Sequence, residues 1–262
     1  MMRSLWTAAS GMRAQQVNVD TIANNVANIN TIGYKSQQAS FKSLLYQNLQ
    51  STSTNNAGEN KPVAAEVGLG SRVAAITSTF TQGNLTHVEN PFSVALEGDG
   101  FFQIRTESGE LQYTRDGSFE ISPVANGNML CTSDGNPVLD AYGNQIILPS
   151  NRVATDLVVN QDGTLAFPDG TGNPAVITDA NGRPVKFGIY QFNNPAGLSK
   201  EGSNNYSVTV ASGAAVAENG NAAVKQTKTH QYYTEASNVD VANEMVNLIV
   251  AQLSLIHISE PT

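Results

Sequence analysis

Histidine and cysteine are the side chains that most often carry metal or nucleophilic chemistry, and this sequence holds few of them. The three histidines, His87, His230 and His257, lie far apart in the chain, and none has a companion at metal-ligand spacing. Zinc sites and catalytic triads need several such groups to converge, so surface or hydrogen-bonded histidines are the better interpretation. Cys131 is the single cysteine and stands beside a turn, which indicates a buried thiol in preference to a nucleophile and excludes an internal disulfide.

Two glycine-rich segments have some features of cation-binding loops. Residues 97–100 and 168–173 place carboxylates among glycines. Calcium loops need more acidic ligands and a closing bidentate glutamate, so turn formation is the better interpretation of both segments. The sequence has no phosphate-binding loop of the Walker type, and no glycine motif that leads from a strand into a helix as a dinucleotide site does. It therefore predicts no enzyme, no cofactor and no metal site.

The charge balance restricts the classes of partner. The chain has 262 residues, with 14 lysines and arginines against 22 aspartates and glutamates, and a formal net charge of -8. Nucleic-acid and membrane-surface binding need clustered basic residues, whereas these are scattered. We count no stretch that approaches the roughly 20 apolar residues of a membrane span, and no secretory signal peptide at the N-terminus. We expect no nucleic-acid binding, no membrane insertion, and export, if any, by a route without a cleaved signal.

The N-terminal region carries a seven-residue apolar repeat. The repeat is formed by Leu5, Met12, Val19 and Val26, with Ile22 between them. This period is typical of a helix that packs along another helix, and it predicts a helix from Ser4 to about Asn28. Few charges and many small residues flank the repeat, which indicates burial among several helices.

A second apolar stripe near the C-terminus has helical spacings of three and four. It consists of Val241, Met245, Leu248 and Ile249. Ser237 or Asn238 is expected to cap this helix, and Asp240 complements its dipole. Because neither stripe has another helix to meet, we expect the two terminal helices to pair.

The middle of the chain alternates short apolar runs with turn dipeptides. The dipeptides are Asp116-Gly117, Asn126-Gly127, Asp134-Gly135, Asp162-Gly163, Asp169-Gly170 and Asn181-Gly182. These pairs favour tight hairpin turns, so the sequence predicts an all-β body in which Phe101 and Phe102 belong to the core or a sheet face. The fold class is therefore α+β: a mainly-β central domain of hairpins, with N- and C-terminal helices pairing as a coiled-coil-like domain.

The chain divides into five expected segments. Residues 1–35 form the N-terminal helical segment, and residues 36–69 form a linker whose polar part, residues 50–60, is flexible in isolation. Residues 70–224 form the β-rich outer domain. Residues 225–252 form the C-terminal helical segment, and residues 253–262 form a non-native tail.

Three groups of residues resemble a known family. Residues 4–16, 22–28 and 31–35 carry a pattern similar to the N-terminal signature of bacterial flagellar rod and hook proteins. Residues 98–102 with 113–119, and residues 235–240, are similar to later segments of the same family. The resemblance extends through residue 252, and residues 4–6 and 41–47 are typical of its distal-rod branch. After residue 252 the family pattern stops, which is why we expect a foreign tail there.

The resemblance implies a structural role. Subunits of this family stack helically into a hollow tube, with terminal helices inside and β-rich domains outside. A distal rod implies contacts with other copies, other rod proteins, the hook protein and the P and L ring proteins, and torque transfer from motor to hook. It also implies location in the basal body and unfolded export through the flagellar type III apparatus, without a cleaved signal peptide. Residues 46–67 correspond to a segment associated in the family with a straight, stiff rod.

The two apolar stripes are the candidate self-assembly interface. They comprise Leu5, Met12, Val19, Ile22, Val26, Val241, Met245, Leu248 and Ile249. We expect them to pack on one another and on neighbouring subunits. Two other interpretations remain: a proximal rod or hook subunit of the same family, and a secreted β-rich binding or adhesin module. Glycan hydrolysis is a third idea, although the sequence identifies no acid with a partner carboxylate for it.

Overall fold

The computed structural model describes residues 2–50, 65–124, 127–149, 152–168, 174–179, 182–221 and 224–260. The chain forms two compact units. We call Met1–Ala27, Gln37–Thr79 and Asp240–Thr262 the helical unit, and Asn28–Ser36 and Phe80–Val239 the β unit. The chain therefore passes between the units four times, after Ala27, Ser36, Thr79 and Val239.

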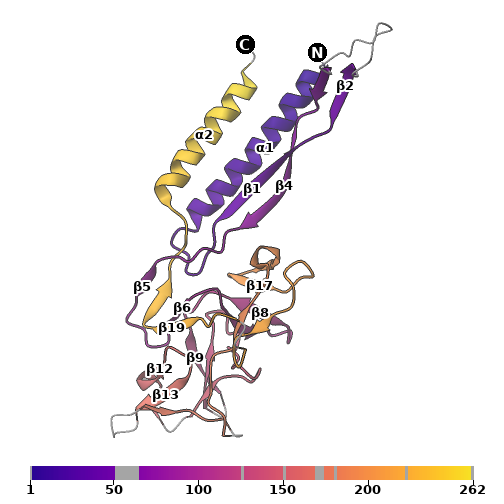
Figure 1. Ribbon diagram of the computed structural model, residues 1–262. Helices are drawn as coiled ribbons and strands as arrows, with labels where there is room; N and C mark the ends of the chain where they lie inside the picture. The colour runs from indigo at the N-terminus through magenta and orange to yellow at the C-terminus, as the bar shows by residue number, and fades with distance from the viewer. Residues whose placement is uncertain are drawn as a thin grey trace. The chain divides into compact units, whose positions relative to one another are not determined.

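Two α-helices of opposite direction lie side by side in the helical unit (Figure 1). Helix α1 spans Met2–Ala27 and α2 spans Val241–Ser259. Near one end of the pair, Asn25 Nδ2 donates to Glu244 Oε1 over 3.1 Å. Near the other end, a Cβ atom added to Gly11 would lie 3.8 Å from Ile258 Cδ1. The expected α+β class with helices at both ends is confirmed.

The start of α2 corrects the sequence analysis. Asp240 is the N-cap, and its side chain accepts a hydrogen bond from Ala242 N over 3.0 Å. Asn238 cannot serve as the cap because its amide binds Ser36 N and Thr81 in the β unit. Ser237 accepts only from Val239 N, over 3.4 Å, which lies before the helix.

The extent of α2 also differs from the expected segments. The helical segment predicted over residues 225–252 begins only at Val241, because residues 228–231 and 233–235 are strands. Residues 253–259, expected as part of the non-native tail, continue the helix. Their apolar residues keep the helical spacing, which gives the helix no reason to stop at residue 252.

Strands occupy part of the expected linker, and residues 71–78, expected in the β-rich outer domain, pair with one of them inside the helical unit. Strand β1 (Gln37–Ser43) pairs antiparallel with β4 (Ser71–Ser78), with a bulge between Ser40 and Phe41. Strand β2 (Tyr46–Gln50) pairs with β3 (Ala65–Gly68). Helix α1 packs against β1 and β4. The segment predicted to be flexible, residues 50–60, lies outside the described residues from residue 51 onward.

The β unit is built from antiparallel strands. Its largest sheet has the order β16-β17-β8-β7-β15-β18, formed by Ser199–Gly202, Asn205–Ser207, Leu111–Thr114, Phe101–Arg105, Ile189–Gln191 and Val216–Ala217. One three-stranded sheet contains β11 (Ile147–Leu148), β10 (Gly127–Cys131) and β9 (Glu120–Val124). The other contains β12 (Val158–Val159), β13 (Leu165–Pro168) and β14 (Pro174–Val176).

Two strand pairs complete the β unit. Strand β19 (Lys228–Gln231) pairs with β6 (Val94–Glu97), and β20 (Tyr233–Glu235) pairs with β5 (Leu85–His87). Two short 3₁₀ turns, Ala154–Asp156 and Pro195–Gly197, lie between strands. The mainly-β central region predicted from the turn dipeptides is confirmed.

Neighbouring phenylalanines on β7 face two hydrophobic clusters. Phe102 packs edge to face on Phe119 and Phe187, with ring centroids 5.0 and 5.4 Å apart, inside the larger cluster. Phe101 packs on Phe80 and Phe192 in the smaller one. This alternation follows from the two-residue period of a strand. The prediction that both phenylalanines belong to the core is confirmed, as is that of a buried Cys131 thiol.

Turn glycines behave as predicted at some positions and differently at another. Gly135 and Gly163 have positive φ angles of 84° and 77°, as tight turns require. Gly117 is not among the positive-φ residues, so its interpretation as a turn glycine is wrong. A Cβ atom there would lie 1.8 Å from Val94 O, so the site needs glycine because two backbones approach closely. Residues 169–170 lie outside the described residues.

Helix α2 corrects the expectation that no stretch is apolar enough to span a membrane. Its 19 residues reach a mean hydropathy of 1.4 over their most apolar window, and only 6% of that window is buried. By length and composition such a helix can cross a bilayer. Helices that are covered by other protein surfaces meet the same test, so this single helix is only a weak indication of a membrane span.

A candidate assembly surface on the helical unit

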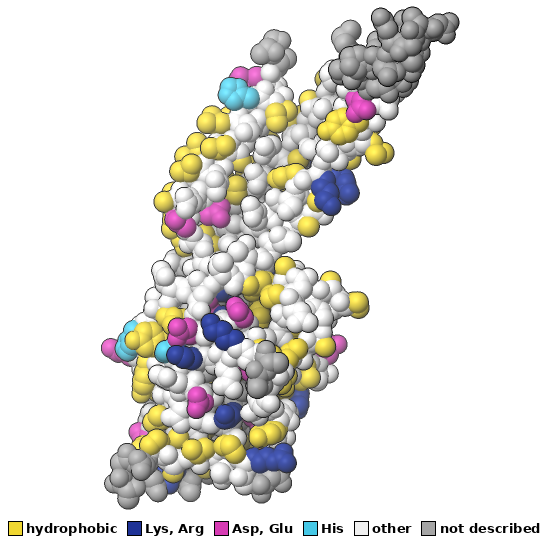
Figure 2. All heavy atoms as spheres, viewed as in Figure 1, with side chains coloured by type: hydrophobic (Ala, Val, Ile, Leu, Met, Phe, Trp, Pro, Cys, Tyr) yellow, Lys and Arg dark blue, Asp and Glu magenta, His cyan; other side chains and the backbone are white. Residues whose placement is uncertain are grey.

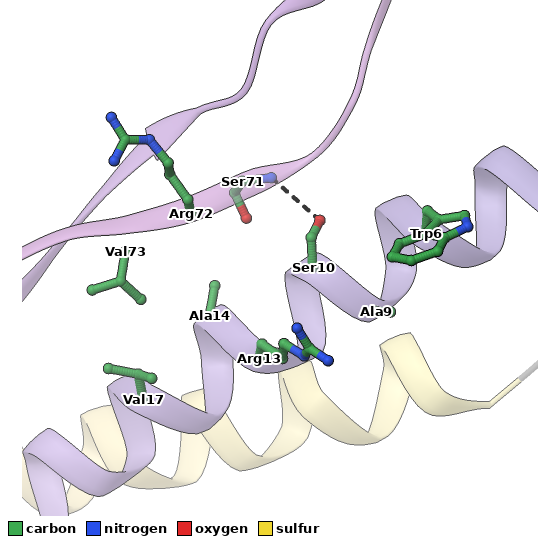
Figure 3. A pocket seen from close by; sticks show the side chains of 9 residues that line it. All are labelled: Trp6, Ala9, Ser10, Arg13, Ala14, Val17, Ser71, Arg72 and Val73. Atoms are coloured by element: carbon green, nitrogen blue, oxygen red, sulfur yellow. Dashed lines mark hydrogen bonds between the residues drawn. The ribbon is translucent and has the colours of Figure 1, made fainter.

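An apolar groove runs between α1 and β4. It has a volume of about 390 Å³ and is lined by Trp6, Ala9, Ser10, Arg13, Ala14 and Val17 of α1 and by Ser71, Arg72 and Val73 of β4. Figure 3 shows Ala14, Val17 and Val73 pointing toward one another from the helix and the strand. Ser71 N donates to Ser10 Oγ over 3.4 Å, the hydrogen bond drawn in the figure. Trp6 is 73% exposed, so the indole is available to a further surface.

Helix α2 exposes most of its apolar side chains. The exposed set is Val241, Met245, Val246, Ile249, Val250, Leu253, Ile256 and Ile258. Figure 2 shows hydrophobic side chains along the visible face of α2. Among the described residues of α2, only Ala251 is buried. An exposed apolar patch of this kind marks a surface that another molecule covers.

The structure distributes the nine predicted interface residues over different environments. Ile22 is buried, and Met12, Val19, Val26 and Leu248 are half-buried. Leu5, Val241, Met245 and Ile249 are exposed. The structure therefore does not gather the nine into one interior seam, and their role in assembly stays a prediction.

The buried face of α1 differs from the predicted heptad face. Ala14, Thr21 and Asn25 are all less than 10% exposed. Met12 and Val19 each precede one of these residues by two positions, which is about 200° around an α-helix. The heptad positions therefore lie largely opposite these three residues, although the chain also buries Ile22 and half-buries Met12, Val19 and Val26.

Asn25 joins elements within the helical unit, a role that was not predicted from the sequence. Its Nδ2 donates to Gln37 O over 2.8 Å and to Glu244 Oε1 over 3.1 Å, and its Oδ1 accepts from Gln37 N over 2.8 Å. The side chain, 1% exposed, thus joins α1 to the start of β1 and to α2. The Asn-Asn pair of the N-terminal signature was the available signal for this site.

The β unit also contains a buried ion cluster that was not predicted from the sequence. Lys35 Nζ lies 2.6 Å from Glu235 Oε1, and Arg115 Nη1 lies 3.3 Å from Glu235 Oε2. All three side chains are at most 1% exposed. Burial lowers the pKa of Lys35, an effect that Glu235 opposes and Arg115 reinforces. The signal was present, since each residue lies in a different segment of the family pattern.

Two of the three histidines, His87 and His230, make ordinary protein contacts. His230 Nε2 lies 2.7 Å from Glu97 Oε2, and this hydrogen bond lowers the pKa of the Glu97 carboxyl. His87 stacks on Tyr232 with ring centroids 6.3 Å apart. Within the described ranges, no group of three or more histidine, cysteine, aspartate and glutamate side chains is placed to hold a metal ion.

Three family models match separate parts of the chain. Residues 5–35 match the model described as flagella basal body rod protein. Residues 95–167 match the D1 domain of the flagellar hook proteins FlgE/F/G. Residues 230–254 match the C-terminal model of the flagellar basal body rod FlgEFG proteins.

Several relatives match over nearly the full length. A protein of Borreliella burgdorferi named flagellar basal-body rod protein FlgG is 40% identical over 258 residues, covering 96% of this chain and 90% of the relative. Proteins of the same name from Agrobacterium fabrum and Caulobacter vibrioides are 38% and 36% identical. Each of these alignments also covers 96% of this chain and 90% of the relative.

Proposed function

The chain belongs to the flagellar basal-body rod protein family and is a structural subunit of the distal rod, and we propose that it assembles through the exposed face of α2 and the groove between α1 and β4. The observation that carries this proposal is the large apolar surface of α2. The family places the protein in the flagellar basal body, together with other rod and hook components.

The energetics favour coverage of α2 by neighbouring copies. Burying one Val, Ile, Leu or Met side chain stabilises an assembly by about 1.5–3 kcal/mol. The exposed set on α2 has eight such side chains, so even partial coverage supplies a large driving force against the cost of association. The groove offers an apolar recess of side-chain dimensions on the same unit. A subunit with an apolar helix and an apolar groove can repeat the same contact from copy to copy, which generates a helical array.

The proposal extends to the finer features that the family resemblance implied. Copies stack into a hollow shaft that carries torque from the motor to the hook, with the terminal helices pairing as a coiled-coil-like layer inside. The shaft contacts the hook protein and the P and L ring proteins. The chain reaches its site unfolded through the flagellar type III apparatus, without a cleaved signal peptide. The low share of charged residues, 14%, supports a chain whose helices are covered by other subunits.

The test is a charge placed on the exposed face of α2. Ile249 is 56% exposed, so Ile249→Asp leaves the fold of the isolated chain intact. In a strain that lacks its own copy of the gene, we expect this variant to be exported but to give no distal rod in electron micrographs of basal bodies, and no swimming. Val210→Asp is the matched control, because Val210 is a fully exposed residue of the β unit. Normal rods with Ile249→Asp would show that the α2 face is not an assembly surface.

A further inference from the structure

Three chain segments of the β unit connect directly to the helical unit. Residues 28–36 form an excursion from the helical unit into the β unit and back, the segment from Phe80 enters the β unit, and the segment ending at Val239 leaves it. Any force that passes along the covalent chain from one unit to the other must pass through these segments. The hydrogen bonds that hold these segments in the β unit therefore determine how such a force is distributed over the unit.

The Glu235 carboxylate fastens all three segments. Its Oε1 accepts from Lys35 Nζ over 2.6 Å and from Gly83 N over 2.8 Å. The Glu235 backbone oxygen accepts from Gly33 N over 2.8 Å. Glu235, on the segment that leaves the β unit, thus binds Gly33 and Lys35 of the excursion and Gly83 of the entering segment.

Lys35 and Asn238 add bonds between the same segments. Lys35 Nζ donates to Thr81 O over 2.9 Å. Asn238 Oδ1 accepts from Ser36 N over 2.7 Å, and Asn238 Nδ2 donates to Thr81 Oγ1 over 2.9 Å. Each segment is therefore bonded to both of the others.

Arg115 joins this set of bonds to the interior of the β unit. Its guanidinium binds Glu235 Oε2 and donates from Nη2 to Gly98 O over 2.6 Å. Its Cζ lies 5.1 Å from the centre of the Phe101 ring, in the smaller hydrophobic cluster. Phe80, at the start of the entering segment, packs on the same ring. Through Arg115 and Phe80, the three bonded segments are thus connected to the Phe101 ring in the smaller hydrophobic cluster.

Stability alone is a poor explanation for burying these charges. Replacing a buried ion pair by apolar residues of similar size is often neutral or stabilising, because desolvation offsets the attraction. Apolar contacts, however, have no preferred direction, whereas hydrogen bonds fix which atoms face each other. Lys35, Arg115 and Glu235 also lie in three different matched segments, 5–35, 95–167 and 230–254. The cluster is where the three parts of the family pattern meet.

We propose that Lys35, Arg115 and Glu235 form a mechanical joint that binds the three connecting segments to one another and to the core of the β unit. A load applied to one segment is then shared by all three, because their hydrogen bonds act in parallel. This inference rests on the proposed function, since only a subunit of a rotating shaft carries such a load. The three residues are positioning residues for that role and contact no partner themselves.

The test uses an apolar replacement that removes the bonds without leaving an unpaired buried charge. In the full chain, the triple variant Lys35→Met, Arg115→Met, Glu235→Leu is compared with His230→Gln, Glu97→Gln, which removes a partly exposed pair of similar length in the same unit. Hydrogen exchange of the Gly33, Ser36 and Gly83 amides is expected to accelerate by about tenfold or more in the triple variant, while the amides of β7 keep their protection. The control pair is expected to leave all of these rates unchanged.

The second part of the test measures motility in cells under increasing mechanical load, applied by raising the viscosity of the medium. Strains carrying the triple variant are expected to build rods and to swim normally in dilute medium, but to lose motility in viscous medium well before the wild type does. Unchanged exchange at the three amides, an equal acceleration across the whole β unit, or an unchanged response to viscosity would each overturn the joint. The exchange arm is independent of assembly: if basal bodies form normally without this protein, the proposed function fails while the exchange result still stands. Should this triple variant fail to fold, Lys35→Met, Arg115→Met, Glu235→Gln provides a second variant, which leaves no buried charge and keeps an acceptor for Gly83 N, and the same three amides are then read.

Discussion

The buried amide of Asn25 offers a sharp test of how the helical unit is held together. In Asn25→Asp the Oδ1 acceptor for Gln37 N is kept, but the donor to Gln37 O and Glu244 Oε1 is replaced by a second acceptor. The substitution preserves the size of the side chain. It also brings a new carboxylate to about the place where Nδ2 lies 3.1 Å from Glu244 Oε1.

Two independent estimates bound the cost of Asn25→Asp. Two like charges 4 Å apart repel by about 4 kcal/mol at an effective dielectric constant of about 20. The new carboxyl can escape this repulsion by taking up a proton, which costs about 1.4 kcal/mol per pH unit above its ordinary pKa of about 3.9, or ~4 kcal/mol at pH 7. Because Glu244 is only half-buried, we expect a loss of about 2–4 kcal/mol at pH 7.

The pH dependence identifies the cause. The folded-state pKa of the new carboxyl is raised above its unfolded value, so the loss must shrink as the pH falls. At pH 5.5 the cost of protonation is only about 2 kcal/mol. Lower pH values approach the sequence pI of about 4.8, where solubility falls.

Urea unfolding followed by circular dichroism at 222 nm is the assay, because both α-helices of the described chain lie in the helical unit. Gln16→Glu makes the same amide-to-carboxylate change at an exposed position of α1 and is expected to have little effect. Adding Glu244→Gln to Asn25→Asp is expected to restore much of the stability, since the new amide can donate to the new carboxylate. A loss that is the same at pH 5.5 and pH 7, or one that Glu244→Gln does not relieve, would refute the reasoning.

Two further predictions concern the β unit. Gly33 has a φ angle of 70°, and a Cβ atom there would lie 2.9 Å from Asp116 N, so Gly33→Ala is expected to cost about 2 kcal/mol or more of unfolding free energy in urea titrations. Gly109→Ala is the control, with a φ angle of 85° but no neighbour within 4 Å, and is expected to cost only the backbone strain. Burial raises the pKa of Asp116 although its carboxylate accepts from Ser118 N and Oγ, so its contribution to stability is lost as pH rises through the folded-state pKa. Asp116→Asn keeps the Oδ1 acceptor, and its urea midpoint is expected to equal or exceed that of the wild type at pH 7, with the difference shrinking as the pH falls toward the ordinary aspartate pKa of about 3.9.

Local signals were enough to predict a helix at each end of the chain and a mainly-β middle, but not the strands within residues 36–69 and 228–235. The seven-residue repeat of α1 and the Asp-Gly turns each depend on residues close in sequence, where period and turn chemistry act directly. The N-cap of α2 shows where local reasoning fails. Asn238 is as good a cap as Asp240 by type, but its amide is already bound to Ser36 and Thr81, far away in sequence.

For the same reason the sequence did not show that Lys35, Arg115 and Glu235 meet, although each lies in a segment of the family pattern. Lys35 and Glu235 are 200 positions apart, and Arg115 and Glu235 are 120 apart. No periodicity links residues at such distances, and charged residues are usually solvated, so their types gave no hint of burial. Only their position in the three family segments set them apart, and that pattern does not say which of its residues touch.

The heptad repeat of α1 is the most informative disagreement between sequence and structure. A seven-residue period predicts that one stripe of the helix is buried, but it does not indicate whether the same chain or another molecule covers that stripe. Within the chain, the covered side of α1 carries Ala14, Thr21 and Asn25, whereas Leu5 of the repeat is 66% exposed. The chain covers part of the repeat itself, because Ile22 is buried and Met12, Val19 and Val26 are half-buried, and coverage of the remainder by other copies stays a prediction. The uncovered part is larger on α2, whose single buried residue, Ala251, lies outside the predicted stripe and where only Leu248 of that stripe is half-buried. The apolar stripes therefore predict two things: a helix pair inside the chain, which the structure shows, and contacts with other copies, which the Ile249→Asp variant tests.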